Sequence, residues 1–128
     1  SLNASLRNIQ NQTPYLRMKG QAVFRFAVKA VEDAIRQSLE KSGKTLDQID
    51  LIVPHQANAR ILGHVADKMG FGLDKFVMNM DEFGNTSSAS IPIAFAQAKA
   101  LGRIQKGSTI CLVGFGAGLI WASTLIEL

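Results

Sequence analysis

Short apolar segments alternate with helical patterns along most of this chain, and this alternation constrains its fold more than any other feature. Strands are predicted at five short apolar segments, residues 15–18, 49–53, 76–80, 108–113 and 119–126. Helices are predicted where apolar residues recur every three or four positions, at residues 21–41, 57–69 and 88–101. Strands that alternate with helices favour a mostly parallel sheet with right-handed crossovers. The order βαβαβαββ therefore predicts an α/β fold with a five-stranded mixed sheet whose last two strands form an antiparallel hairpin.

The composition fits one domain that follows a short loop. With 128 residues, 47% of them apolar, the chain is long enough to bury a core. Residues 1–13 are rich in Asn, Gln and Ser and are expected to be a loop, whereas residues 14–128 form the domain. A net charge of +4 without a Lys/Arg block argues against nucleic-acid binding. One cysteine excludes an internal disulfide and indicates a cytoplasmic location, and no signal peptide is expected.

Residues 109–126 carry no charge over a length that could span a membrane. Gly114, Gly116 and Gly118 interrupt the middle of this segment, and β-branched residues stand on both sides. Two strands joined by a glycine turn explain the pattern better than a membrane span does.

Three polar clusters follow predicted strands, and they are residues 54–58, 84–87 and 114–118. Open α/β sheets place their sites at the carboxyl ends of the strands, and parallel strands end at the same edge. His55, Asn85 and the glycine turn are therefore expected to lie close together.

Each cluster also has a purely structural interpretation. A single His after a strand is often a satisfied structural residue, and Gly84-Asn85 is an ordinary turn pair. The glycine run resembles a phosphate loop, but a strand follows it where a dinucleotide site needs a helix. A tight hairpin is the better interpretation of that run.

Neither of two further reactive side chains predicts a site. Cys111 stands in mid-strand between Ile110 and Leu112, where a thiol behaves as a small buried apolar group rather than a nucleophile. His64 shows no metal-ligand spacing with a Cys or an acidic cluster, so no metal site is expected.

Taken together, these motifs resemble the carboxy-terminal half of the β-ketoacyl-acyl-carrier-protein synthase III family, whose enzymes have the thiolase fold with two related βαβαβαββ halves. The matching segments cover roughly residues 14–128, namely YLRMKG at 15–20, IVPHQAN at 52–58, GNTSSASIP at 84–92, GRI at 102–104 and GFGAG at 114–118.

The resemblance implies that His55 and Asn85 are the catalytic pair. In such enzymes a Cys in the amino-terminal half takes an acyl group from acyl-coenzyme A, and that Cys has no counterpart here. Malonyl-carrier protein then loses carbon dioxide and its enolate attacks the acyl thioester. A neutral imidazole N–H and a carboxamide N–H₂ are expected to stabilise the charge on the thioester oxygen. The Ala117 backbone N–H would bind the acyl oxyanion, and Phe115 would line the pocket.

Binding residues follow from the same resemblance. Asn58 resembles the residue that hydrogen-bonds the pantetheine arm, and Gly20 and Phe24 resemble the lining of its tunnel. Carrier-protein docking is expected at three basic residues, Arg25, Arg60 and Lys68. For each of these charges a solvated helix face is an equally good interpretation, and Asp67, which stands where some relatives have Lys, predicts a weaker docking patch.

The full-length protein is expected to be an acyltransferase of fatty acid synthesis. Acyl-coenzyme A and the phosphopantetheine of the carrier protein are substrates, and no covalently bound cofactor is implied. The expected partners are the carrier protein, the amino-terminal half of the same enzyme and a second copy in a homodimer. Without its nucleophile, the chain alone is expected to be inactive. The alternatives are a thiolase-fold relative of secondary metabolism, making polyketides, quinolones or long-chain ketones, and a non-catalytic half-domain that serves as an interaction module.

Overall fold

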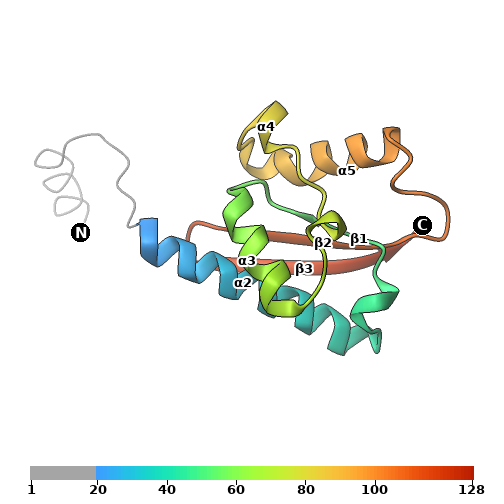
Figure 1. Ribbon diagram of the computed structural model, residues 1–128, viewed down its shortest axis with the longest axis horizontal. Coiled ribbons are helices and arrows are strands. Elements are labelled where there is room, and N and C mark those ends of the chain that lie inside the picture. The colour runs from blue at the N-terminus through green and yellow to red at the C-terminus, as the bar shows by residue number, and fades with distance from the viewer. Residues whose placement is uncertain (1–19) are drawn as a thin grey trace, which may run out of the picture.

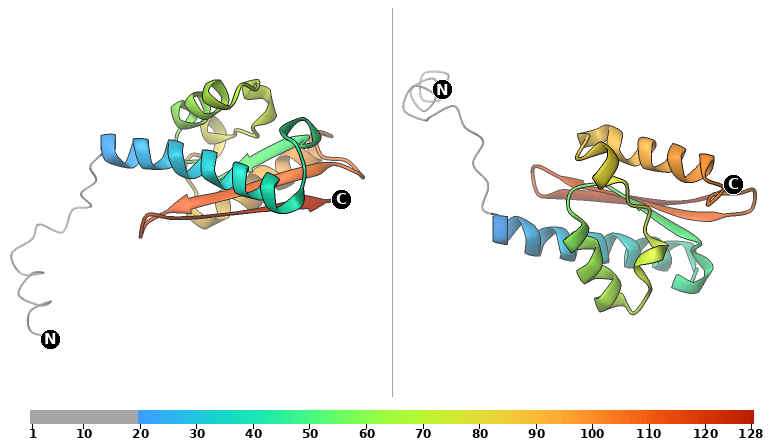
Figure 2. Two further views of the ribbon diagram at one scale, coloured as in Figure 1. Left: turned by 90° about the horizontal axis from the view of Figure 1, so that it is seen from below. Right: turned by 45° about the horizontal axis from the view of Figure 1, so that its top comes forward.

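The computed structural model describes residues 20–128, which form three layers with helices on both faces of a sheet (Figures 1 and 2). The sheet consists of β1 (Leu51–Pro54), β2 (Thr109–Gly116) and β3 (Ile120–Glu127), in that order. β1 runs parallel to β2, with Ile52 opposite Cys111, and β2 pairs with β3 as an antiparallel hairpin. The predicted α/β class and the mixed pairing are therefore both present.

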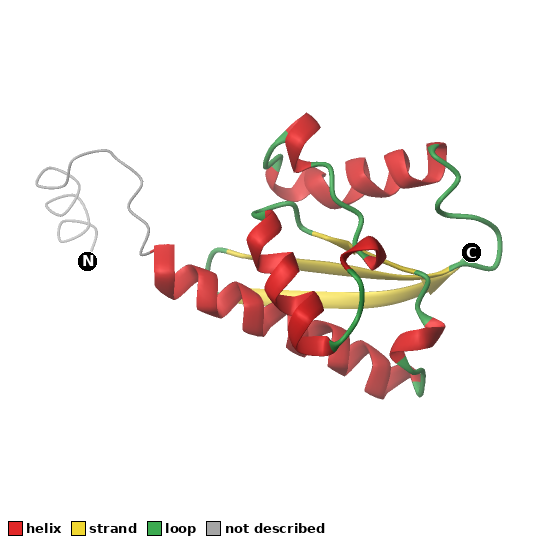
Figure 3. Ribbon diagram, in the orientation of Figure 1, coloured by secondary structure: helices red, strands yellow, loops and turns green. Residues whose placement is uncertain are grey.

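Three longer helices cover this sheet. α2 (Gly20–Ser42) and α3 (Ala59–Met69) lie on one face, and α5 (Ser90–Ala100) lies on the other, as Figure 2 shows. The connections contain the short helix α4 (Met80–Phe83) and three single 3₁₀ turns, at Leu46–Gln48, Leu73–Lys75 and Ser87–Ala89. In Figure 3 the loops before α3 and before α5 lie at the same end of the sheet as the β2–β3 turn.

The ends of α3 follow directly from its sequence. Asn58 precedes the helix, and its side-chain oxygen accepts a hydrogen bond from the Arg60 backbone N–H at 2.9 Å. Gly70 ends the helix in the left-handed conformation, with φ of 76°, and its N–H bonds to the Ala66 carbonyl. Both are preferred devices at helix ends, because they satisfy backbone groups that the helix leaves unpaired.

β1 is buried on both faces, because side chains of both cores cover it. Ile52 faces the larger core between the sheet and helices α2 and α3, whereas Leu51 and Val53 face the smaller core under α5. Alternate residues of one short strand therefore join both cores, which fixes the position of its carboxyl end.

The strand predicted at residues 76–80 is wrong as a regular strand. Phe76 forms one parallel bridge with Ile52, and the Val77 N–H donates to the Ile52 carbonyl at 2.9 Å. The next backbone groups are bound by the buried Gln56 side chain, which donates to the Val77 carbonyl and accepts from the Asn79 N–H. A side chain thus replaces the neighbouring strand, and helix α4 begins at Met80.

Two other expectations concern the sheet. The strand expected at residues 15–18 and the loop expected at 1–13 lie outside the described residues. The described residues contain three of the five expected strands, because residues 76–80 form only one bridge. The apolar segment 109–126 forms β2 and β3, as predicted. Within residues 20–128, the helices are all too short or too polar to cross a membrane.

Candidate active site

His55 stands immediately beyond the carboxyl end of β1. Its backbone N–H donates to the Val113 carbonyl at 2.7 Å, which extends the parallel ladder by one residue and fixes the direction of the side chain. The half-buried ring lies edge-on to Phe115, with the two ring centroids 5.3 Å apart. Its Nδ1 atom lies 2.6 Å from the hydroxyl oxygen of Ser90. Backbone and ring contacts together therefore orient this imidazole.

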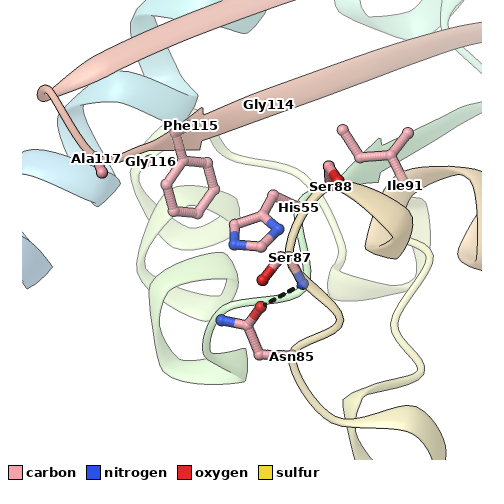
Figure 4. A pocket seen from close by; sticks show the side chains of 9 residues that line it. All are labelled: His55, Asn85, Ser87, Ser88, Ile91, Gly114, Phe115, Gly116 and Ala117. Atoms are coloured by element: carbon pink, nitrogen blue, oxygen red, sulfur yellow. Dashed lines mark hydrogen bonds between the residues drawn. The ribbon is translucent and has the colours of Figure 1, made fainter.

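Asn85 stands in the loop between α4 and the 3₁₀ turn that precedes α5. Gly84, at φ of 66° and ψ of −157°, adopts a conformation that side chains disfavour and so allows the chain to reverse here. The Asn85 carboxamide oxygen accepts a hydrogen bond from the Ser87 N–H at 3.0 Å, so its NH₂ group remains available as a donor. Figure 4 shows this amide nitrogen and one His55 ring nitrogen directed to the same side of the cavity.

The turn after β2 supplies the third part of the site. It carries Phe115 and Ala117, and it closes through Gly118 at φ of 90° and Leu119 at φ of 49°. A positive φ is uncommon outside glycine, so this hairpin has a specific tight shape. Ala117 is exposed and borders the same cavity as His55 and Asn85.

Two adjoining cavities meet at these residues. The first cavity has a volume of about 390 Å³ and includes the Ser87 and Ser88 side chains in its lining (Figure 4). The apolar cavity has a volume of about 380 Å³ and is lined by Val23, Phe26 and other apolar residues. Both cavities share five lining residues, His55, Asn85, Phe115, Gly116 and Ala117. The structure thus brings together the four residues expected at the reacting centre, as the strand order predicts.

The site is electrically neutral among the described residues, because no charged side chain lines either cavity. Burial lowers the pKa of His55 below its ordinary value, and a hydrogen bond to the Ser87 backbone opposes this effect. A reduced pKa keeps the imidazole mainly uncharged at neutral pH. Two neutral polar side chains in a partly apolar cleft are suited to stabilise a charge that develops on a bound ligand.

A second groove lies beside α2 and α3. It has a volume of about 580 Å³ and brings together four of the predicted binding residues, Gly20, Phe24, Arg25 and Arg60. His64 also lines it and packs edge-on against Phe24, with 5.1 Å between ring centroids. The two guanidinium groups, both on exposed residues, give this groove a positive charge.

Lys68 and Asn58 are not among the residues that line this groove. The Lys68 ammonium lies 2.5 Å from a carboxylate oxygen of the buried Glu32, which also pairs with Arg36. Asn58 is exposed, and its oxygen caps α3, which leaves only its NH₂ group for a ligand. Asn58 therefore caps a helix, and Lys68 has a structural role that the sequence patterns did not indicate.

Cys111 is fully buried in β2, opposite Leu125 of β3. Burial raises the pKa of its thiol to about 12. A thiol with such a pKa is almost entirely protonated at neutral pH and is a poor nucleophile. The structure agrees with its interpretation as a packing residue.

Sequence reasoning missed two residues that organise the site, Ser90 and Gln56. Ser90 is buried and contacts His55, although the two are 35 positions apart. Gln56 directly follows His55 and is fully buried, which is unusual for glutamine. The position of Gln56 in the polar cluster 54–58 could have indicated its role, whereas no sequence spacing links Ser90 to His55.

Comparisons with known proteins place this geometry in a family. A family model described as 3-oxoacyl-[acyl-carrier-protein (ACP)] synthase III C terminal matches residues 39–128. β-Ketoacyl-[acyl-carrier-protein] synthase III of Clostridium tetani is 45% identical over 126 residues, which are 98% of this chain and 37% of that protein. The corresponding protein of Symbiobacterium thermophilum is 44% identical over 98% of this chain and 38% of its own length.

Solved structures agree with these sequence matches. The crystal structure of β-ketoacyl-[acyl carrier protein] synthase III from Thermus thermophilus superposes with a TM-score of 0.87 at 42% identity, covering 91% of this chain and 36% of that one. This chain thus spans a little over a third of the length of the relatives that it matches. It belongs to the 3-oxoacyl-[acyl-carrier-protein] synthase III family and corresponds to the carboxy-terminal part of these proteins.

Proposed function

We propose that this chain supplies the decarboxylation site of a β-ketoacyl-acyl-carrier-protein synthase III that acts in fatty acid synthesis. The observation that carries this proposal is the pairing of His55 with Asn85 in one uncharged cavity. The family's condensation needs stabilisation of a thioester enolate, and these two side chains present polar nitrogens without a competing charge.

In the proposed reaction, the acyl group is held as a thioester on a Cys of the amino-terminal part of the enzyme. The C–C bond to the malonyl carboxylate breaks, carbon dioxide leaves, and the electron pair becomes an enolate of the carrier thioester. This enolate attacks the acyl carbonyl, a new C–C bond forms, and the Cys thiolate leaves. Negative charge develops first on the malonyl thioester oxygen, where the Asn85 amide N–H₂ donates a hydrogen bond and the His55 imidazole makes the second contact.

The other parts of the site have roles consistent with this chemistry. The backbone N–H of Ala117 would stabilise the oxyanion that forms when the enolate attacks the acyl thioester. The apolar cavity beside Phe115 fits a thioester-linked apolar arm, and the groove with Arg25 and Arg60 fits phosphate or an acidic protein surface. Acyl-coenzyme A and the carrier-protein phosphopantetheine are the proposed ligands, with Asn58 close to the pantetheine arm. No covalently bound cofactor takes part.

The proposal extends to the assembled protein. Residues 14–128 act together with the nucleophile-bearing amino-terminal part, in a cytoplasmic homodimer. The alternatives, a related condensing enzyme of secondary metabolism and a non-catalytic module, predict other products or none.

A chimeric enzyme tests this function. The chain replaces the corresponding segment of the Clostridium tetani relative, and carbon dioxide release and ketoacyl product are measured with acetyl-coenzyme A and malonyl-carrier protein. We expect turnover that His55→Ala and Asn85→Ala each reduce about 100-fold or more. Thr124→Ala, an exposed position that lines neither cavity, serves as the control. Turnover that is unchanged in both site variants would contradict the proposal, and the chain alone should form no product.

A further inference from the structure

His64 of α3 lines the groove that Arg25 and Arg60 make positive, although the proposed reaction gives it no role. It is exposed, and its ring packs edge-on against Phe24 of α2, with the ring centroids 5.1 Å apart and an angle of 88° between the ring planes. Contacts with two helices thus hold this ring at the wall of the groove.

One hydrogen bond decides which ring nitrogen of His64 can serve a ligand. His64 Nδ1 lies 2.8 Å from the backbone carbonyl oxygen of Arg60, one turn earlier in α3. A carbonyl oxygen can only accept, so Nδ1 carries a proton and donates it. The neutral ring then has its free electron pair on Nε2, and a second proton must bind there. Protonation of His64 therefore places a new N–H donor and a positive charge on the ring atom that is not bonded to the helix.

The other charged side chains near His64 come from the two helices that form the groove. Those of α2 from Lys29 to Arg36 are in ion pairs, namely Lys29 with Asp33, and Glu32 with Arg36 and with Lys68 of α3. Asp67 follows His64 by three positions, so its carboxylate lies on an adjacent part of α3 and opposes the positive charge of the groove. Of the side-chain types among the described lining residues, histidine is the one whose charge ordinarily changes near neutral pH.

A phosphodiester fits this groove better than a flat protein surface does. Guanidinium groups match the geometry of phosphate oxygens, and a protonated imidazole would add a third donor. The groove is hollow, with a volume of about 580 Å³, and the half-buried Phe24 gives it an apolar wall for the uncharged part of a ligand. A pantetheine arm combines these two features, since it joins an uncharged chain to a phosphate ester.

We propose that His64 is a phosphate-binding residue of this groove, which takes up a proton at Nε2 when the phosphodiester of a pantetheine arm binds beside Arg25 and Arg60. The inference rests on the proposed function and deepens it, since it assigns the groove to the phosphate of the arm rather than to the surface of the carrier protein. A bound phosphodiester stabilises the protonated ring, so ligand binding and proton uptake are linked, and acidification strengthens binding. His64 thus acts on substrate affinity and not on the bond-breaking steps.

Dephospho-coenzyme A is the probe, because its diphosphate joins a pantetheine arm to adenosine and does not titrate near neutral pH. Backbone amide spectra of the labelled chain follow its binding at about pH 5.5 and about pH 8, on either side of the range in which histidines ordinarily titrate. We expect binding to be about fivefold tighter at the lower pH, the effect of one exposed charge pair. His64→Gln, which takes up no proton, should bind weakly at both pH values, and His64→Lys, which keeps a positive charge, should bind tightly at both.

Two outcomes overturn the proposal at this stage. One is a chain that does not bind the probe at millimolar concentration, and the other is a His64→Gln variant that keeps the full fivefold change. His55 is present in every variant, so any response that comes from it remains in His64→Gln and can be subtracted. The amide spectra also verify folding of each variant.

Controls separate the groove from general effects of charge. Gln37→Lys adds a positive charge at an exposed position of α2 outside the groove and should leave the affinity unchanged, whereas a gain equal to that of His64→Lys would contradict the proposal. Apo-carrier protein lacks the arm and should show no His64-dependent change. An equal change with apo-carrier protein would assign the groove to an acidic protein surface instead. Because no turnover is measured, failure here is distinguishable from failure of the proposed condensation.

Discussion

The Asn85 carboxamide oxygen accepts a hydrogen bond of 3.0 Å from the backbone N–H of Ser87. This contact fixes the orientation of a group whose two ends are otherwise similar in shape, and it leaves the NH₂ end for a ligand. The Asn85 oxygen therefore orients the side chain, whereas its NH₂ group is the hydrogen-bond donor. One substitution can remove the NH₂ donor and keep the hydrogen bond from the Ser87 N–H.

Asn85→Asp is that substitution. An aspartate oxygen can still accept from Ser87, but the residue has no N–H to donate and adds negative charge beside the forming enolate. In the chimeric enzyme we expect kcat to fall at least as far as in Asn85→Ala, about 100- to 1000-fold. Decarboxylation and product formation are measured together. Activity close to that of the unsubstituted chimera would show that the Asn85 NH₂ group is not a donor in the reaction.

Asn58 should contribute to stability independently of ligand. Because its oxygen caps α3, Asn58→Ala should lower the free energy of unfolding by about 1 kcal/mol, whereas Asn58→Asp retains the cap. Urea denaturation measures both variants. In the chimera, Asn58→Asp separates the two roles, since it lacks the NH₂ group proposed to bind pantetheine and should raise KM. An unchanged KM would leave Asn58 as a cap alone.

The ionisation of Glu32 should make the free energy of unfolding depend on pH. The Lys68 hydrogen bond is the main cause that lowers the Glu32 pKa below its ordinary value, and the Arg36 bond acts in the same direction. A carboxyl whose pKa is lower in the folded state stabilises the fold at pH above the unfolded value of about 4.5, and this contribution is lost as pH falls through the folded pKa.

Glu32→Gln should therefore cost roughly 1 kcal/mol at pH 7, because both cations are more than half exposed, and the difference from the parent should shrink below pH 4. Denaturation at several pH values tests this, with exposed Glu40→Gln on the same helix as control. Equal effects of the two variants at all pH values would contradict the prediction.

Cys111 should be unreactive in the folded chain. With a thiol pKa of about 12, roughly one molecule in ten thousand carries a thiolate at pH 8, and the sulfur is also buried. We expect a thiol-specific dye to label the native chain at least 100-fold more slowly than the chain in urea. Rapid native labelling would mean that β2 opens readily or that the thiol is accessible.

The chain by itself should self-associate. Several large apolar residues are well exposed, among them Leu101, Leu119 and Ile120, with exposed fractions of 71, 62 and 67%. Light scattering over a dilution series, together with a dye that reports apolar surface, tests this expectation. A strictly monomeric chain that binds no dye would contradict it.

The sequence patterns predicted the elements whose ends are determined locally. Gly43 and Gly70 both adopt positive φ, at 69° and 76°, and the helices before them end at Ser42 and Met69, within one residue of the predicted ends. The convergence of His55 with Asn85 was predicted from strand order, but the segment before Asn85 joins β1 through one bridge and the Gln56 side chain rather than as a regular strand.

Contacts between distant side chains could not be predicted in this way. Residues 76–80 are apolar enough for a buried strand, but burial does not say whether a strand or a side chain binds their backbone groups, and here Gln56 binds them. Likewise, a serine at a helix start normally satisfies nearby backbone, so its bond to His55 depends on how α5 meets β1.

Gln56 gives the site an alignment that sheet pairing alone would not supply. Its NH₂ group bonds the carbonyls of Pro54 and Val77, both at 2.9 Å, and its oxygen bonds the Asn79 N–H at 3.0 Å. His55 is held by the sheet, whereas Asn85 belongs to a segment that this carboxamide fastens to β1. Shortening or charging the Gln56 side chain would therefore change the separation of His55 and Asn85 without altering either residue. Substitutions at Gln56 should lower activity even though Gln56 lines neither cavity.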